Sequence, residues 1–485
     1  MWENNLKEKK KILCFAAPAA IVVLASLAIL PFMFRPLWFD EALTINEYIR
    51  LDKISDIYFF YTIPNNHIVY NIFLKCFLGI FPFSEPMLRL PSAIFGLASV
   101  LALFYLLRRQ FGVAISSLLM LCLVFSMPFS IYATAARGYM LSFLLISAAL
   151  VFSLRFVKTR RLSDFAFYFF CVLLSVGTIP SNLAAIFCIF PVILLENNRV
   201  PIKKLSLPIG LLLGGVCLAL AVFYLPILGK FLKAMRLKEG WPDPFQAAFH
   251  FYGALAISFL PAILFGLAGL FSGVAKRKKM FILSLAALLV PGIFFFLRSP
   301  SPFPRALFSC WPVIIYILGH LCHRTAAIMR LKLKAPHRRL IFLSVFLLIM
   351  LTAFFEQGQR AELSKFFTRS GQDDYFKPYF IENFNPVKAV RKTIELRKNR
   401  PDSIFVDKSF DYPSFIFYAG VLGIPRECII FDFPYKQIDN LDSHREIYVV
   451  TTGDERMRGF IERFGFSGYR LEEDLGDIKI YHASK

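Results

Sequence analysis

The chain has 485 residues, of which 57% are hydrophobic and 18% charged, and its mean hydropathy is +0.58. Soluble globular domains are closer to half apolar and a quarter charged, so these values exclude an ordinary soluble protein. The net charge of +22 comes from basic residues in short loops between apolar runs, which is typical of membrane topology and not of nucleic-acid binding.

The cysteines and the N-terminal segment bear on disulfide formation and on targeting. The nine cysteines lack CxxC spacing, and all but Cys428 lie in apolar or membrane-proximal segments, so no disulfide framework is predicted. The basic N-terminus "MWENNLKEKKK" precedes an apolar run that is longer than a signal-peptide core and lacks a small-residue cleavage site. We therefore expect an uncleaved first span.

Apolar runs of about 17–25 residues have the length that crosses a bilayer. The sequence predicts about eleven of them, at residues 11–34, 87–107, 112–131, 138–157, 164–180, 182–196, 205–228, 250–272, 280–297, 304–322 and 340–356. The region 164–196 is expected to form a hairpin that is broken at "TIPSN" (178–182), because Pro180 and Asn182 interrupt the pattern. Residues 1–356 are thus predicted to form a polytopic α-helical membrane domain.

The loops between these runs alternate in charge. One set carries most of the Lys and Arg, as in "RFVKTRR" (155–161) and "AKRKK" (275–279), whereas the other set includes the long loop 35–86 and "TIPSN". The positive-inside rule makes the first set cytoplasmic. With eleven spans, the N-terminus is expected in the cytoplasm and the C-terminus outside, as a multi-pass protein of a cell inner (plasma) membrane.

The outer loop 35–86 opens with "RPLWFDEALT", in which Asp40 and Glu41 follow an aromatic pair. One interpretation is structural: Asp40 caps a helix that starts at Glu41, and Glu41 favours the helix N-terminus electrostatically. The other is chemical: a carboxylate shielded from water by Trp38 and Phe39 acts as a general base on an acceptor at the membrane surface. Spacing leaves both open.

Three arginines lie at outer ends of predicted spans, against the positive-inside bias. They are Arg89 in "RLPSAIFG", Arg137 in "YATAARGYM" and Arg305 in "PRALFSCWP". Each could extend to lipid headgroups. Three of them on the side that carries the carboxylates favour an anion site, since guanidinium suits bidentate phosphate contact.

Residues 357–485 differ sharply in composition and are predicted to form a small extracytoplasmic α/β domain. Strand patterns at 403–407, 428–433, 446–450 and 478–482 alternate with helical patterns at 386–398, 412–423 and 454–465. This order suggests a parallel sheet. Asp407, Asp432 and Asp454 fall near strand ends, where α/β sites occur, although such acids are more often turn residues. Instead of holding a site of its own, this domain is a candidate for recognising the acceptor.

The motifs "WFDEA", "NNHIVYNIFL", "RLPSAIFG", "YATAARGYM" and "PRALFSCWP", in this order over residues 35–315, resemble those of the GT-C membrane glycosyltransferases. The resemblance is to the protein-mannosyltransferase-like branch, which includes aminoarabinose transferases and the Rgt-like group. Three departures stand out: "NNHIV" lacks the two prolines of the family segment, no acidic residue precedes Arg137, and Ala306 follows Arg305 where the family has Tyr.

The resemblance implies a glycosyltransferase that moves a hexosyl or pentosyl group from a polyprenyl-phosphate donor to an extracytoplasmic acceptor, which is a lipid, a polysaccharide or a protein. Asp40 would be the catalytic base and Glu41 a second, positioning carboxylate. The matched substrate-binding residues are His67, Arg89, Arg137, Tyr139 and Arg305. Membrane lipids are the other expected partners, and no nucleic acid is.

One base suffices for direct displacement with inversion, whereas retention needs a second carboxylate at close range. Neighbouring helix positions do not face each other, so we expect inversion. No cofactor is predicted, with a divalent metal on Asp40, Glu41, Glu47 and His67 as the alternative.

The alternative function is a membrane transporter or lipid flippase, but the spans are nearly free of the acids that such proteins carry at mid-membrane. A mere membrane anchor would need one span only.

Overall fold

The computed structural model describes residues 2–61, 66–197, 200–235, 243–271, 278–297 and 301–332, a few positions between 336 and 351, and 386–485 except 402, 409–411, 426–427, 432–444, 452–453 and 476–477. The chain divides into two compact units. The first comprises Met1–Phe34 and Asp52–Arg360, and the second comprises Arg35–Leu51 and Ala361–Lys485. The segment 35–51, which the sequence-based division assigns to the membrane domain, thus groups by its contacts with the C-terminal residues.

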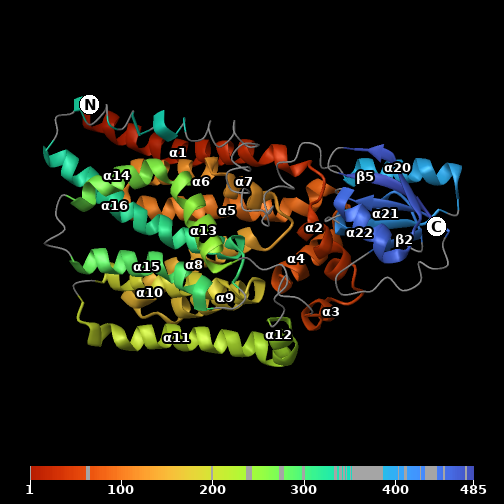
Figure 1. Cartoon of the computed structure of the whole chain (residues 1–485). Helices are drawn as coiled ribbons and strands as arrows, with labels where there is room; N and C mark the ends of the chain where they lie inside the picture. The colour runs from red at the N-terminus through yellow and green to blue at the C-terminus, as the bar shows by residue number, and fades with distance from the viewer. Residues whose placement is uncertain are drawn as a thin grey trace. The chain divides into compact units, whose positions relative to one another are not determined.

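The first unit is helical, and its long helices run roughly side by side (Figure 1). Its helices in chain order are α1 (Trp2–Met33), α3 (Ile54–Phe59), α4 (Ile68–Leu78), α5 (Glu85–Phe111), α6 (Val113–Phe125), α7 (Met127–Thr134), α8 (Tyr139–Thr159), α9 (Leu162–Thr178), α10 (Asn182–Glu196), α11 (Ile202–Tyr224), η2 (Leu225–Ile227), α12 (Leu228–Met235), α13 (Pro244–Ser258), α14 (Leu260–Phe271), α15 (Lys278–Leu297), η4 (Pro304–Cys310) and α16 (Trp311–Lys332).

The predicted polytopic helical architecture is confirmed. Five helices among the described residues are long and apolar enough to cross a membrane, or seven if each of two bent pairs is one span. Further apolar helices, such as α9 and α10, are shorter. Ten of the eleven predicted spans coincide with these helices, while the eleventh, 340–356, lies largely outside the described residues.

Breaks in the helices follow from particular residues. The span predicted at 112–131 bends by 66° between α6 and α7, where the Ser126 hydroxyl accepts from the Phe129 N–H and Pro128 opens the new helix. The break predicted at "TIPSN" is present, since α9 ends at Thr178 and α10 begins at Asn182, but α9 packs mainly on α8 and α10 mainly on α15. The Asn182 amide donates to the Ser175 carbonyl oxygen at 2.8 Å and so closes this turn.

The second unit is built on a five-stranded sheet of order β2-β1-β3-β5-β4. Its elements are α2 (Phe39–Thr44), η1 (Ile45–Ile49), α20 (Pro386–Asn399), β1 (Phe405–Lys408), α21 (Tyr412–Val421), β2 (Ile429–Phe431), β3 (Glu446–Thr451), α22 (Asp454–Phe464), β4 (Gly468–Asp474) and β5 (Lys479–Ser484). All four predicted strands and all three predicted helices of 386–485 are present.

The prediction of a parallel sheet is correct for three strands and wrong for the rest. β1 pairs parallel with β2 and β3, but β5 runs antiparallel to both β3 and β4. β4, which the sequence did not predict, has exposed and half-buried side chains throughout and hence little apolar signal. β4 ends at Asp474 and β5 begins at Lys479, and a connection this short can join only antiparallel strands. The Leu475 N–H donates to the Ile478 carbonyl oxygen at the ends of the two strands.

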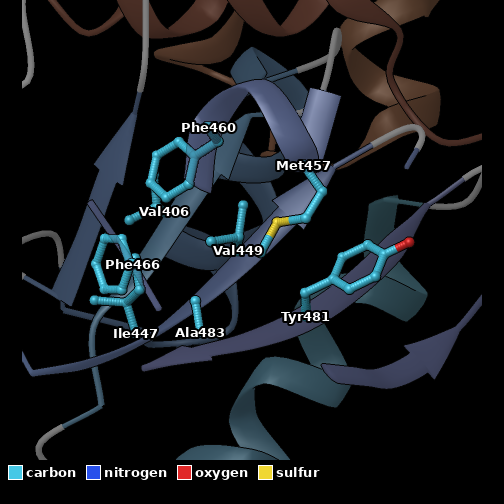
Figure 2. Close-up of a cluster of buried hydrophobic side chains, with 8 residues drawn as sticks. All are labelled: Val406, Ile447, Val449, Met457, Phe460, Phe466, Tyr481 and Ala483. Carbon is cyan, nitrogen blue, oxygen red and sulfur yellow. The ribbon is translucent and has the colours of Figure 1, made fainter. Parts of the chain in front are cut away.

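The core of this sheet is a cluster of buried side chains on one face, covered by α22 (Figure 2). Alternate residues of β3, Ile447 and Val449, meet Val406 of β1 and Met457 and Phe460 of α22. The alternation places one set of strand side chains on this face. β3 is buried at every position from its second residue on, as expected for a central strand.

Candidate functional site

His67 and Arg137, which are 70 positions apart in the sequence, lie in contact in the first unit. His67 is the residue before α4, and Arg137 lies in the short connection between α7 and α8. The His67 Nε2 is 3.2 Å from the Arg137 Nη2, and the Gly138 N–H donates to His67 Nδ1 at 3.0 Å. Both side chains are buried, Arg137 completely.

The contacts of His67 favour a neutral ring. Both ring nitrogens face groups that can only donate, the Gly138 N–H at Nδ1 and the Arg137 guanidinium at Nε2. A doubly protonated ring would set an N–H against each of these donors. Burial, followed by the positive charges of Arg137 and Arg305, holds the pKa of His67 well below its usual 6.5. The ring beside the guanidinium is therefore neutral.

Stability should depend on pH through this histidine. Below pH 6.5 the unfolded chain binds a proton at His67 that the folded protein does not, so acidification favours unfolding until the folded-state pKa is reached. We expect the free energy of unfolding to fall by up to ~1.4 kcal/mol per pH unit below 6.5 from this group. Thermal unfolding of His67→Gln in detergent, measured at pH 7.5 and 5.5 beside the wild type, should show a smaller loss on acidification. An equal loss would contradict the assignment.

Gly138 is the residue that lets His67 and the α7–α8 connection approach each other. A Cβ at this position would overlap the Thr178 methyl group and would lie 3.2 Å from both His67 Nδ1 and Tyr70 Cβ. Its φ is −72°, so the requirement for glycine arises from space and not from backbone conformation. A methyl group here must push α9 or the histidine aside.

Gly138→Ala should therefore destabilise the protein and impair the site together. Overpacking of this kind costs about 1–3 kcal/mol. We expect a lower melting temperature and a weakened His67–Arg137 contact. Gly214→Ala in α11 is the matched control, because nothing lies within 4 Å of a Cβ there. Equal melting temperatures for Gly138→Ala and Gly214→Ala would show that the connection tolerates the extra carbon.

A chain of hydroxyl groups holds the backbone of Arg137. The Ser92 hydroxyl of α5 donates to the Arg137 carbonyl oxygen at 3.2 Å, and the Tyr70 hydroxyl of α4 is 2.9 Å from the Ser92 oxygen. Because Ser92 uses its proton on Arg137, Tyr70 is the donor to Ser92. Tyr139, the first residue of α8, packs edge-on against His67 with ring centroids 5.2 Å apart.

The approach of the chain to His67 is set by two asparagines. The Asn66 amide donates to the carbonyl oxygens of Ile57 and Phe60, at 3.0 and 3.1 Å, and its oxygen accepts from Asn71 at 2.8 Å. Both asparagines are buried. The histidine is thus positioned from α3, from α4 and from the α7–α8 connection.

Arg305 belongs to the same electrostatic environment. It lies in η4, its charge lowers the pKa of His67, and its guanidinium carbon is 4.5 Å from the Phe303 ring centroid, a cation–π contact. The Ser181 hydroxyl of the α9–α10 turn donates to the Ala306 carbonyl oxygen at 3.0 Å and anchors η4. The structure thus brings three predicted residues into contact, namely His67, Arg137 and Tyr139, and Arg305 acts on His67 through its charge.

Arg89 has a different setting. It is buried near the start of α5, and its Nη1 donates to the carbonyl oxygens of Phe32 and Met33, at 3.0 and 3.2 Å. These are the last carbonyls of α1, which have no partner within their own helix. A guanidinium there also complements the helix dipole. These contacts give Arg89 a structural role at the α1 terminus.

Asp40 and Glu41 lie in the second unit. The prediction that Asp40 caps a helix starting at Glu41 is wrong: α2 begins at Phe39, Trp38 is the N-cap residue, and Asp40 is in the first turn. The cap is supplied from within the helix, because Glu41 Oε2 accepts from the Trp38 N–H at 3.2 Å. Asp40 is 3% exposed and Glu41 fully buried. Both carboxyl groups are thus buried, and that of Glu41 also accepts a hydrogen bond from the start of the helix.

The described residues include no group of three or more His, Cys, Asp or Glu that could hold a metal ion. Of the alternative metal ligands, Asp40, Glu41 and Glu47 are in the second unit and His67 is in the first. In the C-terminal domain, Asp432 and the side chains of Asp407 and Asp454 lie outside what the structure describes.

Sequence reasoning did not single out the supporting residues Gly138, Tyr70, Ser92, Asn66 and Asn71. Two signals were available: Gly138 directly follows Arg137, and Tyr70 is three positions after His67, about one helical turn along the chain. The roles of Ser92 and the asparagines depend on contacts between helices and have no local signature.

Comparisons with known proteins agree with this architecture. The family model of dolichyl-phosphate-mannose-protein mannosyltransferases matches residues 65–227, which include His67, Arg89, Arg137 and Tyr139. No curated protein matches the chain in sequence.

Among solved structures, ArnT from Cupriavidus metallidurans bound to undecaprenyl phosphate is similar, with a TM-score of 0.57 and 13% identity over 96% of this chain and 97% of that one. The apo state of the same ArnT gives a TM-score of 0.57 at 12% identity, with the same shares covered. An Archaeoglobus fulgidus oligosaccharyltransferase tethered to an acceptor peptide gives 0.50 at 13% identity, covering 97% of this chain and 74% of that one. The predicted resemblance to GT-C membrane glycosyltransferases is confirmed, and the chain has their fold.

Proposed function

We propose that the protein is an integral-membrane glycosyltransferase that moves a sugar from a polyprenyl-phosphate donor to an extracytoplasmic acceptor with inversion. The observation that carries this proposal is the buried contact of His67 with the Arg137 guanidinium, together with the charge of Arg305, which acts on His67. The pair occurs in a chain whose fold is similar to that of ArnT, which was solved with undecaprenyl phosphate bound.

The pair suits a phosphate chemically. The Arg137 guanidinium is a buried cation with several N–H groups, and the His67 ring 3.2 Å from it is neutral and leaves its charge uncancelled. A phosphate oxygen accepts charge-assisted hydrogen bonds from such a guanidinium. As the bond from the sugar to the phosphate breaks, negative charge grows on the phosphate, and preorganised cations stabilise it most at that point.

Asp40 is the candidate base. Its near-complete burial in the first turn of α2 limits competition from water, and Glu41 is engaged by the Trp38 N–H. In the proposed step the acceptor O–H or N–H gives its proton to Asp40. The acceptor atom forms a bond to the anomeric carbon, the carbon–phosphate oxygen bond breaks, and polyprenyl phosphate leaves. One carboxylate suffices for this inverting displacement.

The basic loops support an orientation in which the N-terminus is cytoplasmic and the C-terminal domain extracytoplasmic, in a cell inner (plasma) membrane. The donor sugar would be a hexose or pentose, and the acceptor a lipid, a polysaccharide or a protein. No metal or other cofactor takes part in the proposed step.

The test is turnover of donors by the full chain in lipid nanodiscs. A panel of undecaprenyl-phosphate sugars is incubated with envelope lipid, polysaccharide and peptide acceptors, and release of undecaprenyl phosphate is measured. We expect cleavage of at least one donor and none of the corresponding nucleotide sugars. Movement of a lipid between leaflets of a vesicle without cleavage would instead favour the flippase alternative.

A further inference from the structure

One helix of the C-terminal domain binds the backbone of Leu37, three positions before Asp40. The Leu37 N–H donates to the Tyr418 hydroxyl at 2.8 Å, and the Ser414 hydroxyl donates to the Leu37 carbonyl oxygen at 2.9 Å. Ser414 and Tyr418 are four positions apart in α21, so they lie on one face of that helix. All three residues are buried. Both polar groups of a single residue are therefore bound by α21.

The same helix also contacts the far end of the segment 35–51. The Arg50 guanidinium carbon is 5.9 Å from the Phe417 ring centroid, and both α2 and η1 pack on α21, beside which α2 lies in Figure 1. Arg50 follows η1, whereas Leu37 precedes α2. The segment is thus attached to α21 before and after the two short helices that it contains.

The attachment at Leu37 is connected to Asp40 by a short, hydrogen-bonded path. Trp38, next to Leu37, is the N-cap residue of α2, its N–H donates to Glu41, and its carbonyl oxygen accepts from the Ala42 N–H at 3.0 Å. Asp40 lies inside this turn. A displacement of the Leu37 peptide therefore moves the start of α2 and the carboxylate that it carries.

We propose that α21 is the element that positions Asp40, and that Tyr418 and Ser414 are positioning residues for the transfer reaction. The C-terminal domain then acts on the catalytic step itself, through the backbone of Leu37, as a support for the base. This inference rests on the proposed function, in which Asp40 is the base. A misplacement of about 1 Å in a reacting group can reduce turnover roughly 100-fold, which is the scale of effect at issue.

The activity test compares single hydroxyl deletions in the full chain. Tyr418→Phe and Ser414→Ala should each lower kcat by about 10- to 100-fold for an undecaprenyl-phosphate sugar that the wild type cleaves, with the KM for that donor within about threefold. Ser414→Thr, which keeps the hydroxyl group, should restore most of kcat. Tyr469→Phe on the exposed face of β4 is the matched control and should match the wild type.

A second measurement tests the positioning without any turnover. Hydrogen exchange of the amides of residues 37–42 should accelerate about tenfold in Tyr418→Phe, because the Leu37 N–H loses its acceptor, and should not change in Tyr469→Phe. Unchanged exchange in Tyr418→Phe overturns the inference. So does faster exchange with an unchanged kcat in an active enzyme. A wild type that cleaves no donor counts against the proposed function alone, since the exchange result still decides whether α21 holds this segment.

Discussion

Replacing Asp40 with asparagine is expected to lower kcat for donor cleavage by about 1,000-fold, with little change in the KM for the donor. Asparagine has nearly the same size and fits the first turn of α2, but it cannot accept the acceptor's proton. General bases contribute roughly 10²–10⁴-fold to enzymatic rates. The measurement is the initial rate of undecaprenyl-phosphate release against donor concentration, for wild type and variant in the same nanodiscs.

Glu41 provides the matched control for this prediction. It adjoins Asp40 and is equally inaccessible, yet its carboxylate accepts from the Trp38 N–H. Glu41→Gln keeps an amide oxygen for that bond, so kcat should stay within about tenfold of the wild type. Glu41→Ala removes the bond and should cost ~1 kcal/mol of stability. If Glu41→Gln abolished turnover and Asp40→Asn did not, the base would be Glu41.

Replacing Arg137 with methionine should have the second-largest effect, a loss of about 100- to 1,000-fold in kcat/KM for the donor. The guanidinium is completely buried beside the His67 Nε2. In the proposed reaction it stabilises charge on the departing phosphate, and the loss of one such donor costs roughly this factor. Methionine matches the length and apolar volume of the arginine side chain, so packing changes little.

Arg137→Lys separates charge from geometry. Lysine keeps the positive charge but lacks the planar fork that lets arginine meet an oxygen pair, so we expect an intermediate loss. The charge also lowers the pKa of His67, so Arg137→Met should raise that pKa, whereas Arg137→Lys should raise it less. Histidine titration by NMR measures this directly. Full activity of Arg137→Met would remove Arg137 from the phosphate site and would count against the proposed donor chemistry.

Local patterns made most of the fold predictable. Apolar runs located α1, the helices from α5 to α11 and those from α13 to α16, because the length and hydropathy of a span depend only on its own residues. Short runs of β-branched and aromatic residues such as "EIYVV" likewise located β3. The strand that escaped, β4, has no buried face and so no hydrophobic alternation to detect.

The candidate site was predictable as a set of residues but not as an arrangement. His67, Arg137, Tyr139 and Arg305 were chosen by resemblance to family motifs. The first unit brings His67, Arg137 and Tyr139 into contact, and Arg305 acts on His67 through its charge. Arg89 was chosen by the same reasoning, yet it contacts the end of α1. An arginine at the mouth of a span looks the same in sequence whether it contacts a ligand or a neighbouring helix.

The sequence by itself determined the class of the protein: a many-span helical membrane protein with an α/β domain at its C-terminus and motifs like those of GT-C transferases. Only the tertiary structure decided which distant segments meet, such as Leu37 with Tyr418, 381 positions apart, and His67 with Arg137. Periodicity and propensity act over a few residues, whereas these contacts depend on the packing of whole elements. Buried polar groups must find partners wherever that packing brings them, and local sequence does not encode the place.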